Sequence, residues 1–448
     1  MQNKSFWYYF MVVLFFFFTS SLTQSCREES DDILSYDGYS PTTFYDAGKS
    51  FQGQFNAVWT ALNCNYALWD FESELGLDWN AVYDKYLPKF AELDNMVENG
   101  EIVGNDIIQP LYEEFLSPLH DGHLQVNIKN TSNSEGEVIS FMPSLLRNRH
   151  RDEFYTDSLP FDKNTNNHLQ YYYLEADADS KFIEHKEASS LMGDKWDFDY
   201  AYGRFGDNIL YYRIKQCKIS ECFSENYSSD EEARQIWKAW FSTIQELHGK
   251  ANLKGLIIDL RNNLGGVFSD YKYILGCLQT YEVEYNGDKF INIGWQRAKN
   301  GVGRLDYAPI IPFRAEIYDG DHAIIDEPVV ILANTYTVSM AEIICLSAKY
   351  MENAIVAGTR TWGGLCALND DYRQYYAGTV GAINGFGYTT TPFYAYIPSI
   401  AFFDKEMRIV DGIGIEPDIY VPFDVSLYEA TGRDSQLERA LQYIRTGK

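Results

Sequence analysis

Four continuous apolar runs in the second half of the chain restrict the fold that it can adopt. The runs are NILYYRI, GLIIDLR, PVVILAN and AIVAGT, each of strand length, and segments with helical spacing separate them. Strands that are apolar along their whole length are covered on both faces and are joined by right-handed crossovers. We therefore expect residues 207–448 to form an α/β core domain.

The residues before this core have a different pattern. Residues 50–123 repeat apolar side chains at steps of three and four, which predicts an N-terminal helical domain, and Asp78 is a predicted N-cap. The aromatic side chains there are expected to fill its core. Residues 124–206 hold the strand-like runs HLQVNI and LQYYYLEA between polar and glycine clusters, so we expect a β-rich intervening segment.

The N-terminus is typical of an exported protein. Residues 1–25 combine Lys4 with an apolar run that is too short to span a bilayer comfortably, which predicts a signal peptide. Ser25-Cys26 resembles a bacterial lipobox, so we expect Cys26 to be lipidated and residues 26–49 to be a tether. The acidic stretch after Cys26 resembles a surface-export tag of Bacteroidetes lipoproteins. The expected location is the cell envelope, as an outer-membrane lipoprotein facing the periplasm or the cell surface. The alternative is an ordinary cleaved signal with an incidental cysteine.

Charge and metal-ligand residues exclude several classes of function. The formal net charge is −27 and no basic cluster is present, so we expect no nucleic-acid partner, and membrane contact only through the lipid. The other six cysteines are scattered without a CxxC pair, and the histidines lack an HExxH motif. We predict no metal. Cys217 and Cys222 are close enough to pair, but two free thiols fit equally well.

Two turns after predicted strands carry residues suited to chemistry. Ser339-Met340-Ala341-Glu342 reads as a capping box at a helix start, and equally as a nucleophile on a strand–helix turn. Gly265-Gly266 in NNLGG can present backbone N–H groups to an oxyanion, or can be a tight turn without a ligand. Ligands collect beyond the carboxyl ends of such strands, which favours chemistry at both turns.

Several motifs in the same order resemble one peptidase family. GLIIDLRNNLGG, NTYTVSMAEI, AIVAGTRTWGG and VDGIGIEPDIYVP look like the serine peptidases of the tricorn core and the C-terminal processing peptidases. DWNAVYDKY and LHDGHLQV resemble the tricorn-like branch. The resemblance implies a crotonase-like spiral of ββα units, hydrolysis of peptides or unfolded proteins without a cofactor, and often a PDZ-like insert, for which residues 124–206 are long enough.

The same resemblance assigns the catalytic residues. Gly364 stands where the processing peptidases have their lysine base, so the base is expected to be His123, as in the tricorn-like branch. In the tricorn-like branch a serine directly before the histidine contacts it, and Gly122 stands at that position here. Asp121 or a water molecule could supply the missing contact. Asp411 aligns with the acid that orients the histidine, and Glu416 is the reserve candidate.

The resulting hypothesis is acyl transfer with Ser339 as the nucleophile and His123 as its base. The N–H groups of Met340 and of Gly265 or Gly266 would hold the oxyanion. A non-catalytic protein that binds an apolar ligand or a peptide on the same scaffold is the main alternative, because the histidine's two partners are altered. A glycan-binding lipoprotein, suggested by the aromatic content, explains the four ordered motifs less well.

Overall fold

The structure is a computed structural model. It describes residues 50–130, 138–144, 182–189, 195–220, 231–300, 303–318, 324–366, 379–380 and 393–448. The predicted signal peptide, the tether with Cys26, and the LQYYYLEA run lie outside these residues. The predicted domain limits, including a PDZ-like identity for residues 124–206, stay predictions.

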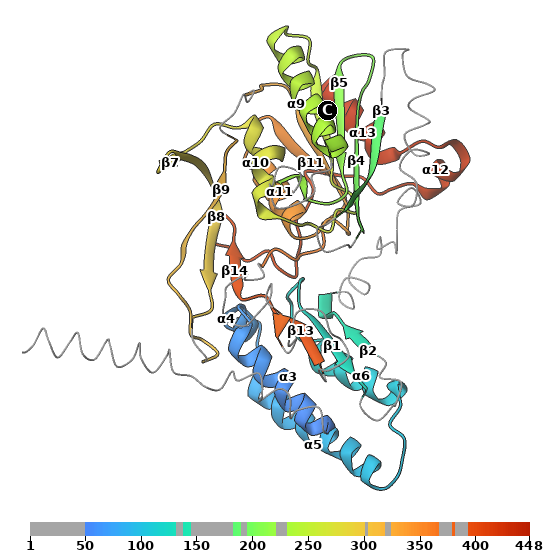
Figure 1. The fold of residues 1–448 in the computed structure, drawn as a ribbon, viewed down its shortest axis with the longest axis vertical. Coiled ribbons are helices and arrows are strands. Elements are labelled where there is room, and N and C mark those ends of the chain that lie inside the picture. The colour runs from blue at the N-terminus through green and yellow to red at the C-terminus, as the bar shows by residue number, and fades with distance from the viewer. Residues whose placement is uncertain are drawn as a thin grey trace, which may run out of the picture.

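The N-terminal region is helical, as its apolar spacing predicts, and lies at one end of the molecule (Figure 1). Asp78 caps its helix as expected, because its carboxylate accepts from the N–H groups of Asn80 and Ala81. Phe55, Trp79 and Phe115 are among the buried aromatic residues that form the core between the helices. The helices are α3 (Phe51–Asn65), α4 (Trp69–Glu74), α5 (Trp79–Glu98) and α6 (Asn105–Leu116).

A small antiparallel sheet joins this helical region to a late part of the chain. Its strands are, in order, β12 (Thr379–Val380), β13 (Phe393–Tyr396), β1 (Gln125–Lys129) and β2 (Val138–Phe141). Val126 and Ile128 of β1 and Ala395 of β13 lie in the same buried core as the helices. The strand predicted in HLQVNI therefore completes the helical region together with β13.

The predicted α/β core contains a seven-stranded sheet in the order β15-β11-β10-β6-β5-β4-β3. The strands from β15 to β5 are parallel. β4 and β3 extend the sheet at the β5 edge, and each pairs antiparallel with its neighbour. The bounds are β3 (Phe182–Ser189), β4 (Lys195–Arg204), β5 (Ile209–Ile214), β6 (Gly255–Asp259), β10 (Val329–Ala333), β11 (Ala354–Gly358) and β15 (Ile419–Tyr420). β3 and β4 fall inside the segment 124–206 but pair with this sheet.

Both faces of this sheet are covered, which explains its fully apolar strands. Tyr212, Ile258 and Ile331 pack against α9 (Glu231–Gly249) and α11 (Met340–Ala348), whereas Ile257 and Val330 pack against α13 (Ser435–Thr446) on the other face. The mixed α/β fold with an N-terminal helical region, as the sequence predicts, is confirmed.

The segment VFSDYKYILGCL, one of those with helical spacing between the apolar runs and therefore expected to be a helix, is broken. It forms the 3₁₀ turn η4 (Phe268–Asp270), the short helix α10 (Tyr271–Ile274) and the 3₁₀ turn η5 (Gly276–Leu278). The buried carboxylate of Asp270 accepts from the N–H groups of Ile219 and Ser220, so it is tied to a neighbouring loop at the point where a regular helix would begin.

The remaining elements lie around this core. They are β7 (Val283–Tyr285), β8 (Asp288–Ala298), β9 (Ile311–Glu316), β14 (Ile400–Phe403) and α12 (Val425–Thr431). Figure 1 shows β7, β8 and β9 as an arm beside α10 and α11. Among the described residues, no helix is long and apolar enough to cross a membrane.

Candidate active site

Ser339 lies in the turn between β10 and α11 with an unusual backbone conformation. Its φ is 59° and its ψ is −123°, a region that residues with a side chain rarely adopt and that costs about 1–3 kcal/mol. Its side chain is partly exposed, whereas the flanking strand and helix are buried. A strained serine between a buried strand and a helix is the geometry of a nucleophile turn.

The turn that holds Ser339 (residues 334–340) is tied to the glycine turn (residues 262–266) by an amide pair. Asn334 Oδ1 accepts from the backbone N–H of Asn262 at 2.9 Å, and Asn334 Nδ2 donates to Asn262 Oδ1 at 2.6 Å. The N–H of Val338 donates to the carbonyl oxygen of Asn263 at 2.9 Å. These contacts fix the two turns relative to each other.

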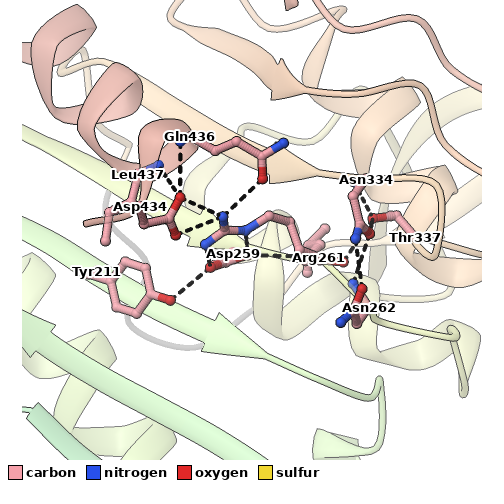
Figure 2. Close-up of polar contacts among 10 residues, drawn as sticks. Tyr211, Asp259, Arg261, Asn262, Asn334, Thr337, Asp434, Gln436 and Leu437 are labelled. Carbon is pink, nitrogen blue, oxygen red and sulfur yellow. Dashed lines mark hydrogen bonds and ion pairs between the residues drawn. The ribbon is translucent and has the colours of Figure 1, made fainter. Parts of the chain in front are cut away.

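A buried ion network anchors the start of the glycine turn, as Figure 2 shows. The Arg261 guanidinium donates to both carboxylate oxygens of Asp259 and forms an ion pair with Asp434 at 2.8 Å. Tyr211 donates to Asp259, and Gln436 accepts from Arg261. Although burial opposes ionisation, Arg261 lowers the pKa of Asp259 to about 2. The network joins β6 to the C-terminal helix α13.

Of the two glycines in the glycine turn, Gly265 passes close to Ser339 and Gly266 passes close to Cys217. A Cβ on Gly265 would lie 2.6 Å from the Cβ of Ser339, and one on Gly266 would lie 2.1 Å from the carbonyl oxygen of Cys217, so neither position has room for a side chain. The N–H of Gly265 donates to Asn263 Oδ1 at 2.8 Å. Among the described residues, the N–H groups of Gly266 and Met340 have no hydrogen-bond partner.

Glu342 connects the Ser339 turn to a second loop, the strap (residues 361–366). Its carboxylate, with no exposed surface, accepts from the N–H groups of Ser339 at 3.1 Å, Gly363 at 2.7 Å and Gly364 at 2.7 Å. It also accepts from Thr361 Oγ1 at 2.5 Å. Burial raises the pKa of Glu342 to about 7, against the effect of these hydrogen bonds. The glutamate of the predicted capping box therefore serves a wider role than the helix start.

His123 reaches the strap from the other side. Its Nδ1 lies 2.5 Å from the carbonyl oxygen of Cys366, which only accepts hydrogen bonds. Nδ1 therefore carries the proton and Nε2 has the free lone pair. Burial lowers the pKa of His123 to about 4, so the imidazole is neutral at neutral pH. His123 and Ser339 are not hydrogen-bonded to each other in the described part of the chain.

The strap brings the neighbourhoods of His123 and Ser339 together. A Cβ on Gly364 would lie 3.3 Å both from the backbone of Gly122 and from Val338, so Gly364 runs between the residues that precede the histidine and the serine. A Cβ on Gly122 would lie 2.0 Å from the carbonyl oxygen of Gly363. A serine cannot fit at position 122, which accounts for the departure from the tricorn-like pattern.

Asp411, the predicted orienting acid, lies beside the strap rather than against the imidazole. Its carboxylate accepts from the N–H groups of Leu365 at 3.1 Å, Cys366 at 2.5 Å and Gly122 at 3.4 Å. The group that contacts the His123 ring is the carbonyl of Cys366, which the sequence did not single out. Glu416, the reserve candidate, forms an ion pair with Arg360 at the surface.

Asp121 and Asp411 form a buried acidic pair close to the backbone of residues 122–124. Asp121 Oδ1 accepts from the N–H groups of His123 and Leu124, while its Oδ2 is buried without a partner among the described residues. Burial and the neighbouring Asp411 raise the pKa of Asp121 well above its usual range, and burial raises the pKa of Asp411 to about 6. Two close carboxyls that share one proton behave in this way.

The acidic pair and Cys366 together form a cluster of side chains of the kinds that bind metal ions. Ligand atoms of Asp121, Cys366 and Asp411 lie within 4.8 Å of one another. Asp411 is already occupied by three N–H donors, and burial raises the pKa of the Cys366 thiol, which disfavours the thiolate that a metal requires. Cys217 is a buried free thiol, and Cys222, which is close enough in the sequence to pair with it, lies outside the described residues.

Ser339 lies at a strand–turn–helix position, and the strap links its turn to the loop of His123. Comparison with known proteins shows to which family this part of the chain is related. Residues 209–421 match the Peptidase family S41 model, so the chain carries a domain of this serine peptidase family. The resemblance that the sequence motifs predict is thereby confirmed.

Related sequences support this assignment. The chain is 26% identical over 195 residues to the tricorn protease of Thermoplasma volcanium, and 26% identical over 202 residues to tricorn protease homolog 1 of Streptomyces coelicolor. These matches cover 44% and 45% of this chain but only 15% of each relative. The chain thus spans a small part of the length of these two relatives.

Solved structures extend the similarity of fold over most of the chain. A crystal structure of a protein from Parabacteroides merdae matches with a TM-score of 0.57 and 18% identity, covering 88% of this chain and 97% of that one. Mature CPAF matches with a TM-score of 0.50 and 13% identity, covering 89% and 96%. At these identities, the likeness concerns the fold alone.

Proposed function

We propose that the chain is a serine peptidase that hydrolyses peptide bonds through an acyl-enzyme at Ser339. The observation that carries this proposal is the strained Ser339 turn, which lies against Gly265 of the glycine turn. The backbone N–H groups of Met340 and Gly266 in these two turns have no partner among the described residues. Strain of this kind persists where the surrounding structure imposes it, and such residues cluster at active sites.

His123 is the base in this proposal. Nε2 of His123 takes the Ser339 proton while Ser339 Oγ attacks the scissile carbonyl carbon. The resulting imidazolium then gives its proton to the leaving amine. In the second half of the reaction, His123 takes a proton from a water molecule that attacks the acyl-enzyme carbonyl. The proton then passes to Ser339 Oγ, which leaves, so that the carboxylate product is released and Ser339 is restored. The carbonyl of Cys366 holds the ring in the required tautomer and stabilises the imidazolium.

The oxyanion would be held by the N–H groups of Gly266 and Met340. Sequence left Gly265 and Gly266 open, and the hydrogen bond from the Gly265 N–H to Asn263 favours Gly266. Met340 is the first residue of α11, so the helix N-terminus adds favourable partial positive charge. Loss of one such donor typically removes about 3–4 kcal/mol of transition-state stabilisation.

The test is Ser339-dependent cleavage and labelling. The wild-type protein is expected to digest a denatured, fluorescently labelled casein and to react with a fluorophosphonate probe, whereas Ser339→Ala does neither. Ser347→Ala, which removes another serine of the same helix, is the matched control and should keep both activities. If wild type and Ser339→Ala behave alike, the non-catalytic binding protein replaces the peptidase as the better interpretation.

We also propose that the chain is exported and tethered at the cell envelope through a lipid on Cys26, on the basis of the N-terminal sequence. The proposed substrates are then peptides or unfolded proteins outside the cytoplasm. Incorporation of radiolabelled palmitate into wild type, and its loss in Cys26→Ser, tests the anchor. Equal labelling of both proteins would contradict it.

A further inference from the structure

Glu342 is the buried group that contacts both halves of the proposed site. Its Oε2 accepts from the N–H groups of Ser339 and Gly364, and its Oε1 accepts from Thr361 and Gly363. The Ser339 contact fixes the nucleophile turn, and the other three fix the strap. One carboxylate therefore sets the position of the turn relative to the strap.

The strap in turn holds the base. Beyond Gly364 it continues to Cys366, whose carbonyl accepts from His123 Nδ1. Asp411 secures this end of the strap through the N–H groups of Leu365 and Cys366. A continuous series of hydrogen bonds and backbone thus runs from the N–H of Ser339, through Glu342, to the imidazole.

We propose that Glu342 in its ionised form is a positioning residue that sets the separation of Ser339 and His123, so that release of its proton switches peptide hydrolysis on. The inference rests on the peptidase function proposed above. It adds a control of the reaction by a group that touches neither the substrate nor the reacting atoms.

The hydrogen-bond count explains why only the ionised form fits. Four donors point at the two oxygens, so every contact uses the carboxylate as an acceptor. A proton on either oxygen faces an existing donor and displaces it, which leaves a buried N–H or hydroxyl unsatisfied. Such a loss is worth about 1–3 kcal/mol and moves the Ser339 turn or the strap.

The groups around Glu342 place this proton release near neutrality. Burial raises the pKa of Glu342 to about 7, the hydrogen bonds from Thr361, Gly364 and Gly363 lower it, and the negative charge of Asp411 raises it again. Cys345, one turn along α11, feels the Glu342 charge and is a neutral thiol because burial raises its pKa.

The sign of the pH dependence follows. Below pH 7 the protonated, displaced form predominates, and above pH 7 the ionised form does, so activity rises as the pH increases through about 7. His123, with its pKa lowered to about 4, adds a separate rise near pH 4. Glu342 and His123 therefore predict two acidic limbs in the pH profile, near pH 7 and near pH 4. Asp411, which secures the strap and whose pKa burial raises to about 6, adds a limb between them.

The experiment measures kcat/KM for denatured labelled casein and the fluorophosphonate labelling rate of Ser339 from pH 4 to 9. In the wild type, both should fall about tenfold per pH unit below pH 7, as expected for one proton. Glu342→Gln keeps the size but cannot ionise, so it should lower the plateau at least tenfold and abolish the limb near pH 7. The limb near pH 4 should remain.

The matched control is Asp404→Asn. Asp404 is also a buried carboxylate that accepts backbone N–H groups in a turn, those of Glu406 and Arg408, but among the described residues it has no hydrogen bond with the strap or Ser339. This variant should keep the limb near pH 7. Circular dichroism at each pH checks folding, and Glu342→Asp, which still ionises, should shift the limb rather than remove it.

The outcomes separate the two proposals. If Ser339-dependent cleavage is present and Glu342→Gln keeps the limb near pH 7, the role of Glu342 is overturned while the peptidase stands. If Glu342→Gln does not fold, a limb in Glu342→Asp at the wild-type pH overturns it in the same way. If no Ser339-dependent cleavage or labelling occurs at any pH, both proposals fail.

Discussion

The carbonyl oxygen of Cys366 lies 2.5 Å from Nδ1 of His123, and the backbone N–H of the same cysteine donates to Asp411. Asp411, the acid expected to orient His123, therefore does not contact the ring but holds Cys366, whose carbonyl does. A carbonyl cannot take up the imidazole proton, so it fixes the tautomer as well as the orientation of the ring.

Removal of the imidazole should reduce peptide hydrolysis without unfolding the protein. We expect His123→Ala to lower kcat by about 10²–10⁴, the usual contribution of a general base. Initial rates on labelled casein measure this effect. His120→Ala is the control, because His120 lies on the same loop but pairs with Glu72. Equal losses in the two variants would contradict the assignment of the base.

The acidic pair should make the folded protein less stable as the pH rises from about 4 to 6. The pKa of Asp411 is raised to about 6 from an ordinary 3.8, so the folded state binds more protons than the unfolded state in that window. The free energy of unfolding is expected to fall by up to about 3 kcal/mol over this pH range. Urea unfolding at pH 4 and pH 7 should show a smaller difference for Asp411→Asn than for the wild type. If the difference between pH 4 and pH 7 is the same in Asp411→Asn as in the wild type, the acidic pair does not cause the pH dependence of stability.

A serine at position 122 should damage the site instead of improving it. Its Cβ would meet the carbonyl oxygen of Gly363 at 2.0 Å, and overpacking of this kind typically costs about 1–3 kcal/mol. We expect Gly122→Ser to lower both the unfolding temperature and kcat. Gly249→Ser, where nothing lies within 4 Å of the added Cβ, should leave both unchanged. A more active Gly122→Ser would refute the steric explanation.

Loss of the guanidinium in the Arg261 network should be severe. Arg261→Met leaves the buried carboxylates of Asp259 and Asp434 uncompensated, for which about 3–5 kcal/mol is typical. Arg433→Met removes an exposed pair with Glu438 and should change the free energy of unfolding by less than about 1 kcal/mol. Urea denaturation measures the free energy of unfolding of both variants. Equal changes in the two variants would contradict a large stabilising contribution from the Arg261 network.

The sequence predicts the elements of this fold better than it predicts their contacts. The apolar runs identify β5, β6, β10 and β11, because strands covered on both faces lack polar residues. Ser339 and His123 are predicted as site residues from the motifs around them, and this assignment stays a prediction. The helix predicted after Gly266 is broken, since the contacts of Asp270 with another loop outweigh local helical spacing.

The orienting contacts of the site could not be predicted from residue types. The group that holds His123 is a backbone carbonyl, which every residue possesses, so no side chain signals it. The wider role of Glu342 was visible only as a capping box, because its partners in the strap are backbone N–H groups. The reason for Gly122 is steric and appears only when Gly363 lies against it.

The hydrogen bond from Gly122 to Asp411 joins residues 289 positions apart, which has a consequence for the order of events during synthesis. At about 5–20 residues per second, a ribosome needs roughly 15–60 s to pass from one to the other. During that interval the histidine loop is already made, but the loops that complete the site are not. The proposed site therefore stays incomplete until Asp411 has emerged from the ribosome, whatever the state of the N-terminal helices.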